Sequence, residues 1–220
     1  RIGQIKSTDG IVTGNRTKIK IVKNKVADGT NRYGDFLDIA CAISARAPYY
    51  GLHKSQNRHA RLVLNVAGLS PQLLGQSAFY PVLGALIGRM AGETVCAVTG
   101  MPNGATDDEL KSLCAGAAST GAVALVHIVG VTPEAPDLET ALGGLPPEQT
   151  VHLTTEMVIK ARNRLSLAKA GPIDSVALGS PHFSSAECRA LLRLADGKPF
   201  KVPVYLCLGR HTLSELQADG

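Results

Sequence analysis

Segments typical of strands alternate with segments typical of helices along most of this 220-residue chain. Such alternation favours an α/β fold with a largely parallel sheet. Two S/T-x-x-E patterns, at Thr106 and Ser184, predict helix starts because both ends of each pattern satisfy backbone N–H groups. The predicted strands are residues 18–23, 61–67, 94–98, 122–129, 151–153, 173–178 and 202–208. The predicted helices are residues 35–45, 73–90 (kinked or divided near Pro81 and its glycines), 106–119, a short one near 138, 154–169, one from 184 and one from Thr212 or Ser214.

The positive charge of the chain is concentrated at its N-terminal end. Residues 1–32 carry eight Lys and Arg against two Asp, a net charge of +6, whereas the remainder has a net charge of −1. A solvated strand face explains this basic segment better than a phosphate-binding stripe, and aromatics are only 4% of the chain. We therefore expect no nucleic-acid partner, and we divide the chain into a basic segment, 1–27, and a main domain, 28–220.

The cysteines and the apolar stretches indicate in which cellular compartment the protein functions. Five cysteines, an odd number without a C-x-x-C pair, suit a reducing cytoplasm better than a secreted disulfide scaffold. The longest apolar stretch, residues 78–87, is interrupted by Gly and Pro and is too short to span a bilayer, and no secretory segment opens the chain. We expect a cytoplasmic protein without a membrane partner. The chain begins without a Met, which suggests a partial domain.

Four polar, glycine-bearing segments follow predicted strands: residues 99–103, 127–134, 179–184 and 209–211. In open α/β sheets, ligands bind beyond the carboxyl ends of the strands. We therefore predict that Thr99, His127, Ser180 and Arg210 converge at one edge of a single sheet. Sequence signatures of serine hydrolases, of nucleotide-binding loops and of zinc sites do not occur in the chain.

Several long stretches, taken together, resemble the catalytic domain of the aconitase X family. They are residues 29–38 (GTNRYGDFLD), 42–46, 48–53 (PYYGLH), 78–84 (AFYPVLG), 121–127, 129–135 (VGVTPEA) and 178–184 (LGSPHFS). The resemblance covers roughly residues 28 to 213. It implies an aconitase-like α/β catalytic domain, here partial, that works with a small swivelling domain, fused or separate.

The resemblance implies a lyase that removes water from a small hydroxy acid with the help of iron, either mononuclear or in an iron–sulfur cluster. The TNRYGD form at residues 30–35 is similar to the branch that converts cis-3-hydroxy-L-proline to Δ1-pyrroline-2-carboxylate in hydroxyproline metabolism. The alternative is the archaeal branch of phosphomevalonate dehydratase large subunits. Two further alternatives are an inactive partial domain that only binds a partner, and a nucleic-acid-binding module that uses the basic segment.

The implied reaction needs a cation for the carboxylate, a base for the α-proton and a Lewis acid for the leaving hydroxide. Arg32 and Arg210 are the candidate carboxylate ligands because a guanidinium binds a carboxylate through two hydrogen bonds. Ser180 and His182 lie in a turn whose N–H groups can stabilise an oxyanion, which makes them the candidate catalytic residues. Further candidate substrate contacts are Asn31 and His53.

Cys41 is the candidate iron ligand that the resemblance implies, because it lies in the stretch after residues 29–32 in which the family keeps one. Cys96 and Cys207 lie within predicted strands and Cys188 lies early in a helix, so we expect these three to be structural. Cys114 remains undecided between the two roles.

Overall fold

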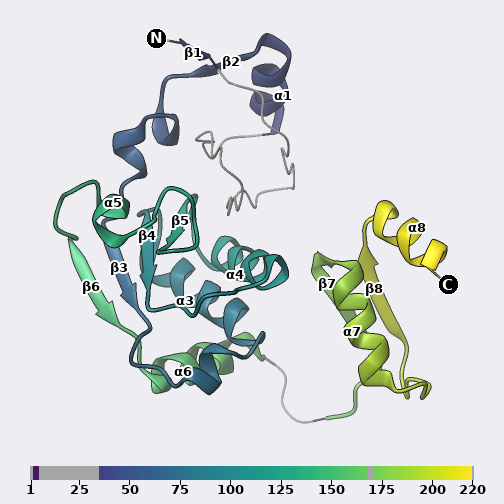
Figure 1. Cartoon of the computed structure of the whole chain (residues 1–220). Coiled ribbons are helices and arrows are strands. Elements are labelled where there is room, and N and C mark those ends of the chain that lie inside the picture. Colours follow the sequence, from purple (N-terminus) through teal and green to yellow (C-terminus); the bar gives the residue numbers. More distant parts are fainter. Residues whose placement is uncertain (1, 5–34, 168–170, 220) are drawn as a thin grey trace. The chain divides into compact units, whose positions relative to one another are not determined.

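The computed structural model describes residues 2–4, 35–167 and 171–219, and the chain forms two compact units, residues 1–164 and 165–220 (Figure 1). Each unit contains parallel strands joined through helices, which confirms the predicted α/β class. The boundary predicted after residue 27 lies outside the described residues. The division near residue 164 is a feature that the sequence did not indicate.

The first unit is built on a four-stranded, fully parallel sheet in the order β5-β4-β3-β6. Its central strand, β3, pairs with a neighbour on each side, so that Leu62 lies beside Cys96 and also beside Gln149. The strands are β3 (Leu62–Asn65), β4 (Cys96–Thr99), β5 (Val126–Ile128) and β6 (Gln149–His152).

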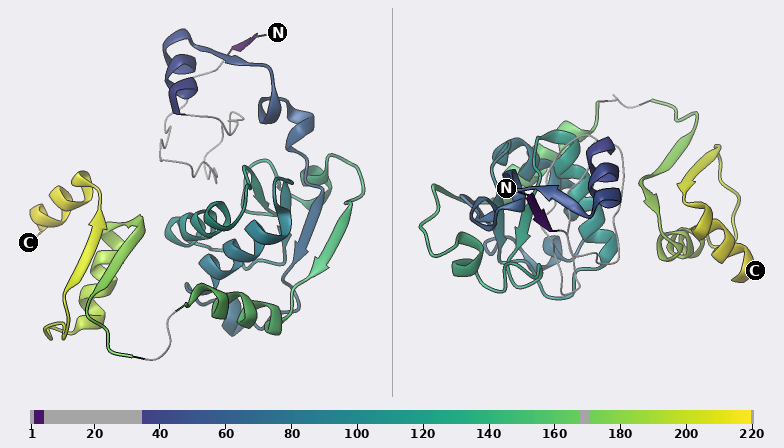
Figure 2. Two further views of the ribbon diagram at one scale, coloured as in Figure 1. Left: turned by 180° about the vertical axis from the view of Figure 1, so that it is seen from behind. Right: turned by 90° about the horizontal axis from the view of Figure 1, so that it is seen from above.

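Helices cover both faces of this sheet (Figure 1 and Figure 2). Leu62 and Leu64 point into the larger apolar core, which α3, α4 and α6 complete, whereas Val63 points into a smaller core on the opposite face, under α5. Burial on both faces explains why the inner strands β3 and β4 are largely apolar instead of alternating. The helices are α2 (Pro71–Leu74), α3 (Phe79–Ala91), α4 (Asp107–Thr120), α5 (Leu138–Leu142) and α6 (Thr155–Leu165).

Helices α3 and α4 pack unusually close to each other because glycines line their contact. A Cβ at Gly84 would overlap the carbonyl oxygen of Leu113 in α4. A Cβ at Gly121, just after α4, would overlap the carbonyl oxygen of Gly88 in α3. Only residues without a side chain allow the two backbones to approach this far.

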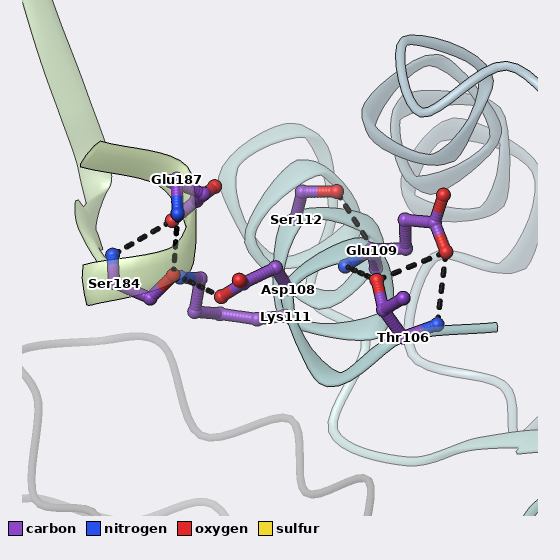
Figure 3. Close-up of polar contacts among 7 residues, drawn as sticks. All are labelled: Thr106, Asp108, Glu109, Lys111, Ser112, Ser184 and Glu187. Atoms are coloured by element: carbon purple, nitrogen blue, oxygen red, sulfur yellow. Dashed lines mark hydrogen bonds and ion pairs between the residues drawn. The ribbon is translucent and has the colours of Figure 1, made fainter. Parts of the chain in front are cut away.

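The predicted capping boxes are present at the starts of α4 and α7 (Ser185–Ala195), and Figure 3 shows both. At α4, the Oγ1 of Thr106 accepts a hydrogen bond from the N–H of Glu109 at 3.2 Å, and the Glu109 carboxylate accepts one from the N–H of Thr106 at 2.8 Å. The Ser77 hydroxyl donates to the same carboxylate at 3.0 Å. Glu109 therefore joins the start of α4 to the segment that leads into α3.

The N-terminal part of the first unit contains short elements. Strand β1 (Ile2–Gln4) pairs antiparallel with β2 (Arg46–Pro48), and α1 (Asp35–Ser44) precedes β2. Two 3₁₀ turns follow, η1 (Gly51–His53) and η2 (Ser55–Arg58), and neither contains a fully buried residue. The sequence indicated α1 but none of the other short elements.

The second unit is a parallel pair of strands with two helices. Strand β7 (Val176–Phe183) leads into α7, and β8 (Val204–Leu208) leads into α8 (Arg210–Asp219). Its large apolar side chains are mostly exposed, among them Leu192, Leu194 and Tyr205.

Most predicted elements of the described chain are confirmed, with three differences in position or length. The helical stretch predicted over residues 73–90, kinked or divided near Pro81, is divided into two helices, but the first of them ends at Leu74, before Pro81. Pro81 lies in the first turn of α3, where its missing N–H costs no hydrogen bond. Strand β5 is shorter than predicted, and α8 begins at Arg210, before Thr212 and Ser214.

Two further expectations concern the termini and the membrane. The strand predicted at residues 18–23 lies outside the described residues. None of the helices in the described ranges combines the length and apolar character that crossing a bilayer requires.

Candidate functional site

A bulge interrupts strand β7 at the segment that the sequence analysis selected. Leu178 pairs with Leu206, but the next pair is Phe183 with Leu208, so residues 179–182 stand opposite the single residue Cys207. A bulge of this kind redirects backbone and side chains at the end of a strand. It places Ser180 and the exposed His182 in the bulged part of β7.

Gly179 makes this bulge possible. Its φ of 108° lies in the region that residues with side chains rarely adopt. A Cβ at this position would also overlap the carbonyl oxygen of Cys207 on the neighbouring strand. The backbone of β7 can therefore take its bulged path at Gly179 because no side chain is present there.

Two helices begin at the same edge of the small sheet, because β7 and β8 are parallel and each leads directly into a helix. At α7, Ser184 and Glu187 form the capping box (Figure 3), with the Ser184 N–H bound to the Glu187 carboxylate at 2.9 Å. At α8, the preceding residue Gly209 has no side chain that can accept from the helix. Helix N-termini carry partial positive charge and backbone N–H donors, which together favour anions.

Exposed basic side chains stand at this edge as well. Arg210 and His211 occupy the first turn of α8, and both are exposed. An arginine beside helix N-termini can bind a carboxylate through two parallel hydrogen bonds while backbone N–H groups complete the site. The carboxyl edge of the β7–β8 pair is thus an arrangement suited to a carboxylate or another small anion.

The structure brings together some of the predicted site residues. Ser180, His182 and Arg210 all lie at the carboxyl edge of the β7–β8 pair, as predicted. The prediction that Thr99 and His127 share a single sheet with them is wrong, because those two residues belong to the four-stranded sheet of the first unit. His127 is also no surface ligand, since it is a core residue with 2% of its surface exposed.

The remaining predicted residues lie in the N-terminal part of the chain. His53 ends η1 and is partly exposed, and Cys41 is buried in α1 with 6% of its surface exposed. Asn31 and Arg32 lie outside the described residues.

All five cysteines belong to the described part of the chain and are free thiols. Burial raises the pKa of Cys96 and of Cys114 to about 12, which disfavours the thiolate in the absence of a metal ion. Cys188 is buried as well, whereas Cys207 lies in β8 as predicted but is exposed.

The iron that the family resemblance implies is not matched by a complete ligand set here. Within residues 2–4, 35–167 and 171–219, no three His, Cys, Asp or Glu side chains gather closely enough to hold a metal ion. The Cys41 sulfur is a suitable donor for iron, but the described residues do not form an iron site around it.

A buried polar cluster in the first unit was missed by sequence reasoning. The ring of His127 makes a 2.7 Å hydrogen bond from Nε2 to the carbonyl oxygen of Arg58, and the Nδ1 atom has no partner. The Arg58 guanidinium makes two hydrogen bonds to the Glu134 carboxylate, one of them 2.7 Å long, and a third of 3.2 Å to the carbonyl oxygen of Leu52. Arg58 lies 76 positions from Glu134, so no local pattern could have joined them.

Burial lowers the pKa of His127 below the ordinary histidine value. Its hydrogen bond to the Arg58 carbonyl and the nearby Glu134 carboxylate oppose this effect without reversing it. The carbonyl partner requires that Nε2 carries the hydrogen, and the lowered pKa favours the neutral imidazole, in which Nδ1 is unprotonated.

Comparison with known proteins places both units in one protein family. The family model for the second domain of aconitase X matches residues 60–163, and the model for its third domain matches residues 173–220. The chain belongs to the aconitase X family. The two matched segments correspond to the two structural units, which confirms the family resemblance seen in the sequence.

Named relatives share much of this chain. It is 38% identical over 87% of its length to a cis-3-hydroxy-L-proline dehydratase of Pseudomonas aeruginosa, and 40% identical over 83% to one of Hypocrea jecorina. It is also 38% identical over 77% of its length to a phosphomevalonate dehydratase large subunit of Methanothermobacter thermautotrophicus. The chain spans 33%, 31% and 40% of these relatives, respectively.

A solved structure of the family also resembles this one. The holo-form of Thermococcus kodakaraensis aconitase X superimposes with a TM-score of 0.73 at 29% identity. The match covers 87% of this chain and 47% of that one. The aconitase X fold seen there is therefore also the fold of this chain.

Proposed function

We propose that the protein to which this chain belongs is an iron-dependent hydro-lyase that removes water from a small hydroxy acid. The observation that carries the proposal is the 38–40% identity to two cis-3-hydroxy-L-proline dehydratases over 83–87% of the chain. The proposed substrate is accordingly cis-3-hydroxy-L-proline. Loss of its α-proton and its β-hydroxyl gives an unsaturated product that becomes Δ1-pyrroline-2-carboxylate.

In this proposal the substrate carboxylate binds at the carboxyl edge of the β7–β8 pair. Arg210 offers a guanidinium in the first turn of α8, and the bulge at residues 179–182 offers backbone N–H groups. Negative charge moves onto the carboxylate as the α-proton leaves, and donors held in place before the reaction stabilise that charge most effectively. Ser180 and His182, in the bulge, are the proposed catalytic residues for this step.

Further proposed substrate contacts lie in the N-terminal part of the sequence. Arg32 is the second proposed carboxylate ligand, and Asn31 and His53 are the further proposed contacts. Cys41 is proposed as one iron ligand, with the other ligands supplied by parts of the whole protein outside the described residues. Relatives of one branch are named large subunits. A small swivelling domain, fused or separate, is accordingly the proposed partner.

A second candidate function is that of a phosphomevalonate dehydratase large subunit. The 38% identity to the Methanothermobacter relative supports it, but the corresponding relative of Methanocaldococcus jannaschii is only 29% identical. A partial domain without turnover, which only binds a partner, is the remaining alternative.

The test is anaerobic purification of the full-length protein, followed by iron analysis and turnover assays. We expect bound iron and formation of Δ1-pyrroline-2-carboxylate from cis-3-hydroxy-L-proline, with little turnover of mevalonate 5-phosphate. The reverse preference would select the second candidate. Absence of turnover with either substrate in iron-loaded protein would favour the remaining alternative, a partial domain that only binds a partner.

A further inference from the structure

The two 3₁₀ turns η1 and η2 need an explanation for their fixed position, because neither contains a fully buried residue. A segment without fully buried side chains gains less from the hydrophobic effect than a core element, so its polar contacts contribute more to holding it. Here one of its members, Arg58, makes contacts in three directions. This segment, residues 51–58, also carries His53.

The first contact fixes the backbone of the segment. The Nε2–H of His127 donates to the carbonyl oxygen of Arg58 at 2.7 Å. His127 lies on β5, in the sheet, and pairs with Ala97 of β4. The segment is thus tied to the four-stranded sheet of the unit by a partly buried hydrogen bond.

The second contact fixes the side chain of Arg58. Its guanidinium is bound by both carboxylate oxygens of Glu134, and the two side chains are only 11% and 29% exposed. The loop that carries Glu134 is itself held by Thr132, whose Oγ1 accepts from the N–H of Ile128 at 3.1 Å. The Glu134 carboxylate is therefore held in place by its loop and can fix the Arg58 guanidinium.

The third contact reaches the residue next to His53. The Nη1 of Arg58 donates to the carbonyl oxygen of Leu52 at 3.2 Å. Leu52 also packs against the smaller apolar core. The backbone next to His53 is consequently linked to a chain of contacts that begins at His127 and Glu134.

We propose that His127, Arg58 and Glu134 are positioning residues that fix residues 51–58 and so hold His53 in place for the substrate. This inference rests on the proposed function, in which His53 contacts the substrate. In this proposal, His127, Arg58 and Glu134 do not themselves touch the substrate. They act through the backbone of the segment, and His127 does so as a hydrogen-bond donor in its neutral form.

The test compares four variants of the full-length protein. His127→Leu removes the donor and keeps an apolar side chain of similar size, whereas His127→Gln keeps an N–H that can reach the Arg58 carbonyl. Glu134→Gln weakens the support of Arg58 at a partly exposed position, so that it tests the same network if His127→Leu does not fold. His152→Leu, at an exposed histidine of β6, is the matched control.

Amide hydrogen exchange tests the contacts of His127, Arg58 and Glu134 independently of enzyme activity. In His127→Leu and Glu134→Gln we expect exchange in residues 51–58 to rise about tenfold, as loss of one buried hydrogen bond implies, while β3 and β4 keep their protection. His127→Gln and His152→Leu should match the wild type. Unchanged exchange in residues 51–58 of both His127→Leu and Glu134→Gln overturns the proposal.

Steady-state kinetics with cis-3-hydroxy-L-proline test whether these contacts position His53 for the substrate. We expect KM to rise about tenfold in His127→Leu with kcat changed less, and His127→Gln to restore most of the loss. A fall in kcat alone, or a Gln variant as impaired as the Leu variant, contradicts positioning through this hydrogen bond. If the wild type has no dehydratase activity, the proposed function fails, and the exchange result still decides whether His127 holds the segment.

Discussion

Gly179 lies against the backbone carbonyl of Cys207 on the neighbouring strand, with a φ of 108° and no room for a Cβ. This contact permits the bulge at residues 179–182, and the bulge in turn brings Ser180 and His182 to the edge where α7 and α8 begin. The candidate anion site of the second unit therefore depends on one glycine that belongs to the backbone framework.

Gly179→Ala should disrupt this bulge. The new Cβ meets backbone atoms that cannot rotate away, and the φ is strained in addition. Gly197→Ala is a matched control, because Gly197 also has a positive φ, of 68°, but has open space around it. In urea unfolding of the full-length protein, we expect Gly197→Ala to lower the free energy of unfolding by about 1 kcal/mol. Gly179→Ala should lower it clearly more. Equal losses would mean that the contact with Cys207 is unimportant.

Gly84→Ala tests the close approach of α3 and α4. An alanine normally stabilises a helix relative to glycine, but here its Cβ overlaps the carbonyl oxygen of Leu113. We expect destabilisation of about 2 kcal/mol or more from overpacking, measured by chemical denaturation. Gly68→Ala, at a position with open space, should stay within about 0.5 kcal/mol of the wild type. A stabilised Gly84→Ala protein would refute the close packing.

The lowered pKa of His127 predicts a pH dependence of stability. The unfolded chain takes up a proton on this residue near the ordinary histidine pKa of 6.5, whereas the folded protein resists protonation until a lower pH. The unfolded state therefore binds more protons between these two values, so the contribution of His127 to stability is complete above pH 6.5 and declines as the pH falls below it. The decline should be smaller in His127→Gln, measured by urea unfolding across this range. Identical pH profiles would contradict the burial of a neutral imidazole.

Cys41→Ser tests the proposed iron ligand. We expect the anaerobically purified full-length variant to lose most of its iron, because a hydroxyl is a much poorer iron ligand than a thiolate. Cys207→Ser, at the exposed cysteine of β8, should retain the iron content of the wild type. Equal iron in Cys41→Ser and wild type would assign the ligand to another residue.

Local signals in the sequence predicted the elements well. The capping boxes at Thr106 and Ser184 start helices where predicted, since both partners of each box lie within four residues of each other. The start of α8 was placed too late because the preferred capping residues are Thr212 and Ser214. The structure instead begins the helix directly after Gly209, where strand β8 ends.

Relations between distant residues were the part that the sequence could not show. Placing Thr99 and Arg210 at one sheet required knowing which strands pair, and parallel pairing leaves no mark in either strand alone. The network of Arg58 with Glu134 was missed for the same reason. The common edge of Ser180 and Arg210 was predicted correctly because both belong to one continuous β–α–β segment. Ser180 lies in the bulge that interrupts β7, and Arg210 directly follows β8.

The most direct test of the central claim is the kcat/KM of full-length Arg210→Lys on cis-3-hydroxy-L-proline, relative to the wild type. Lysine keeps the positive charge but loses the planar pair of donors, so we predict a fall of about tenfold or more, mainly through KM. Arg193→Lys, in the last turn of α7 and so at the opposite end of that helix, should equal the wild type. A kcat/KM for Arg210→Lys that also equals the wild type would contradict carboxylate binding at this edge.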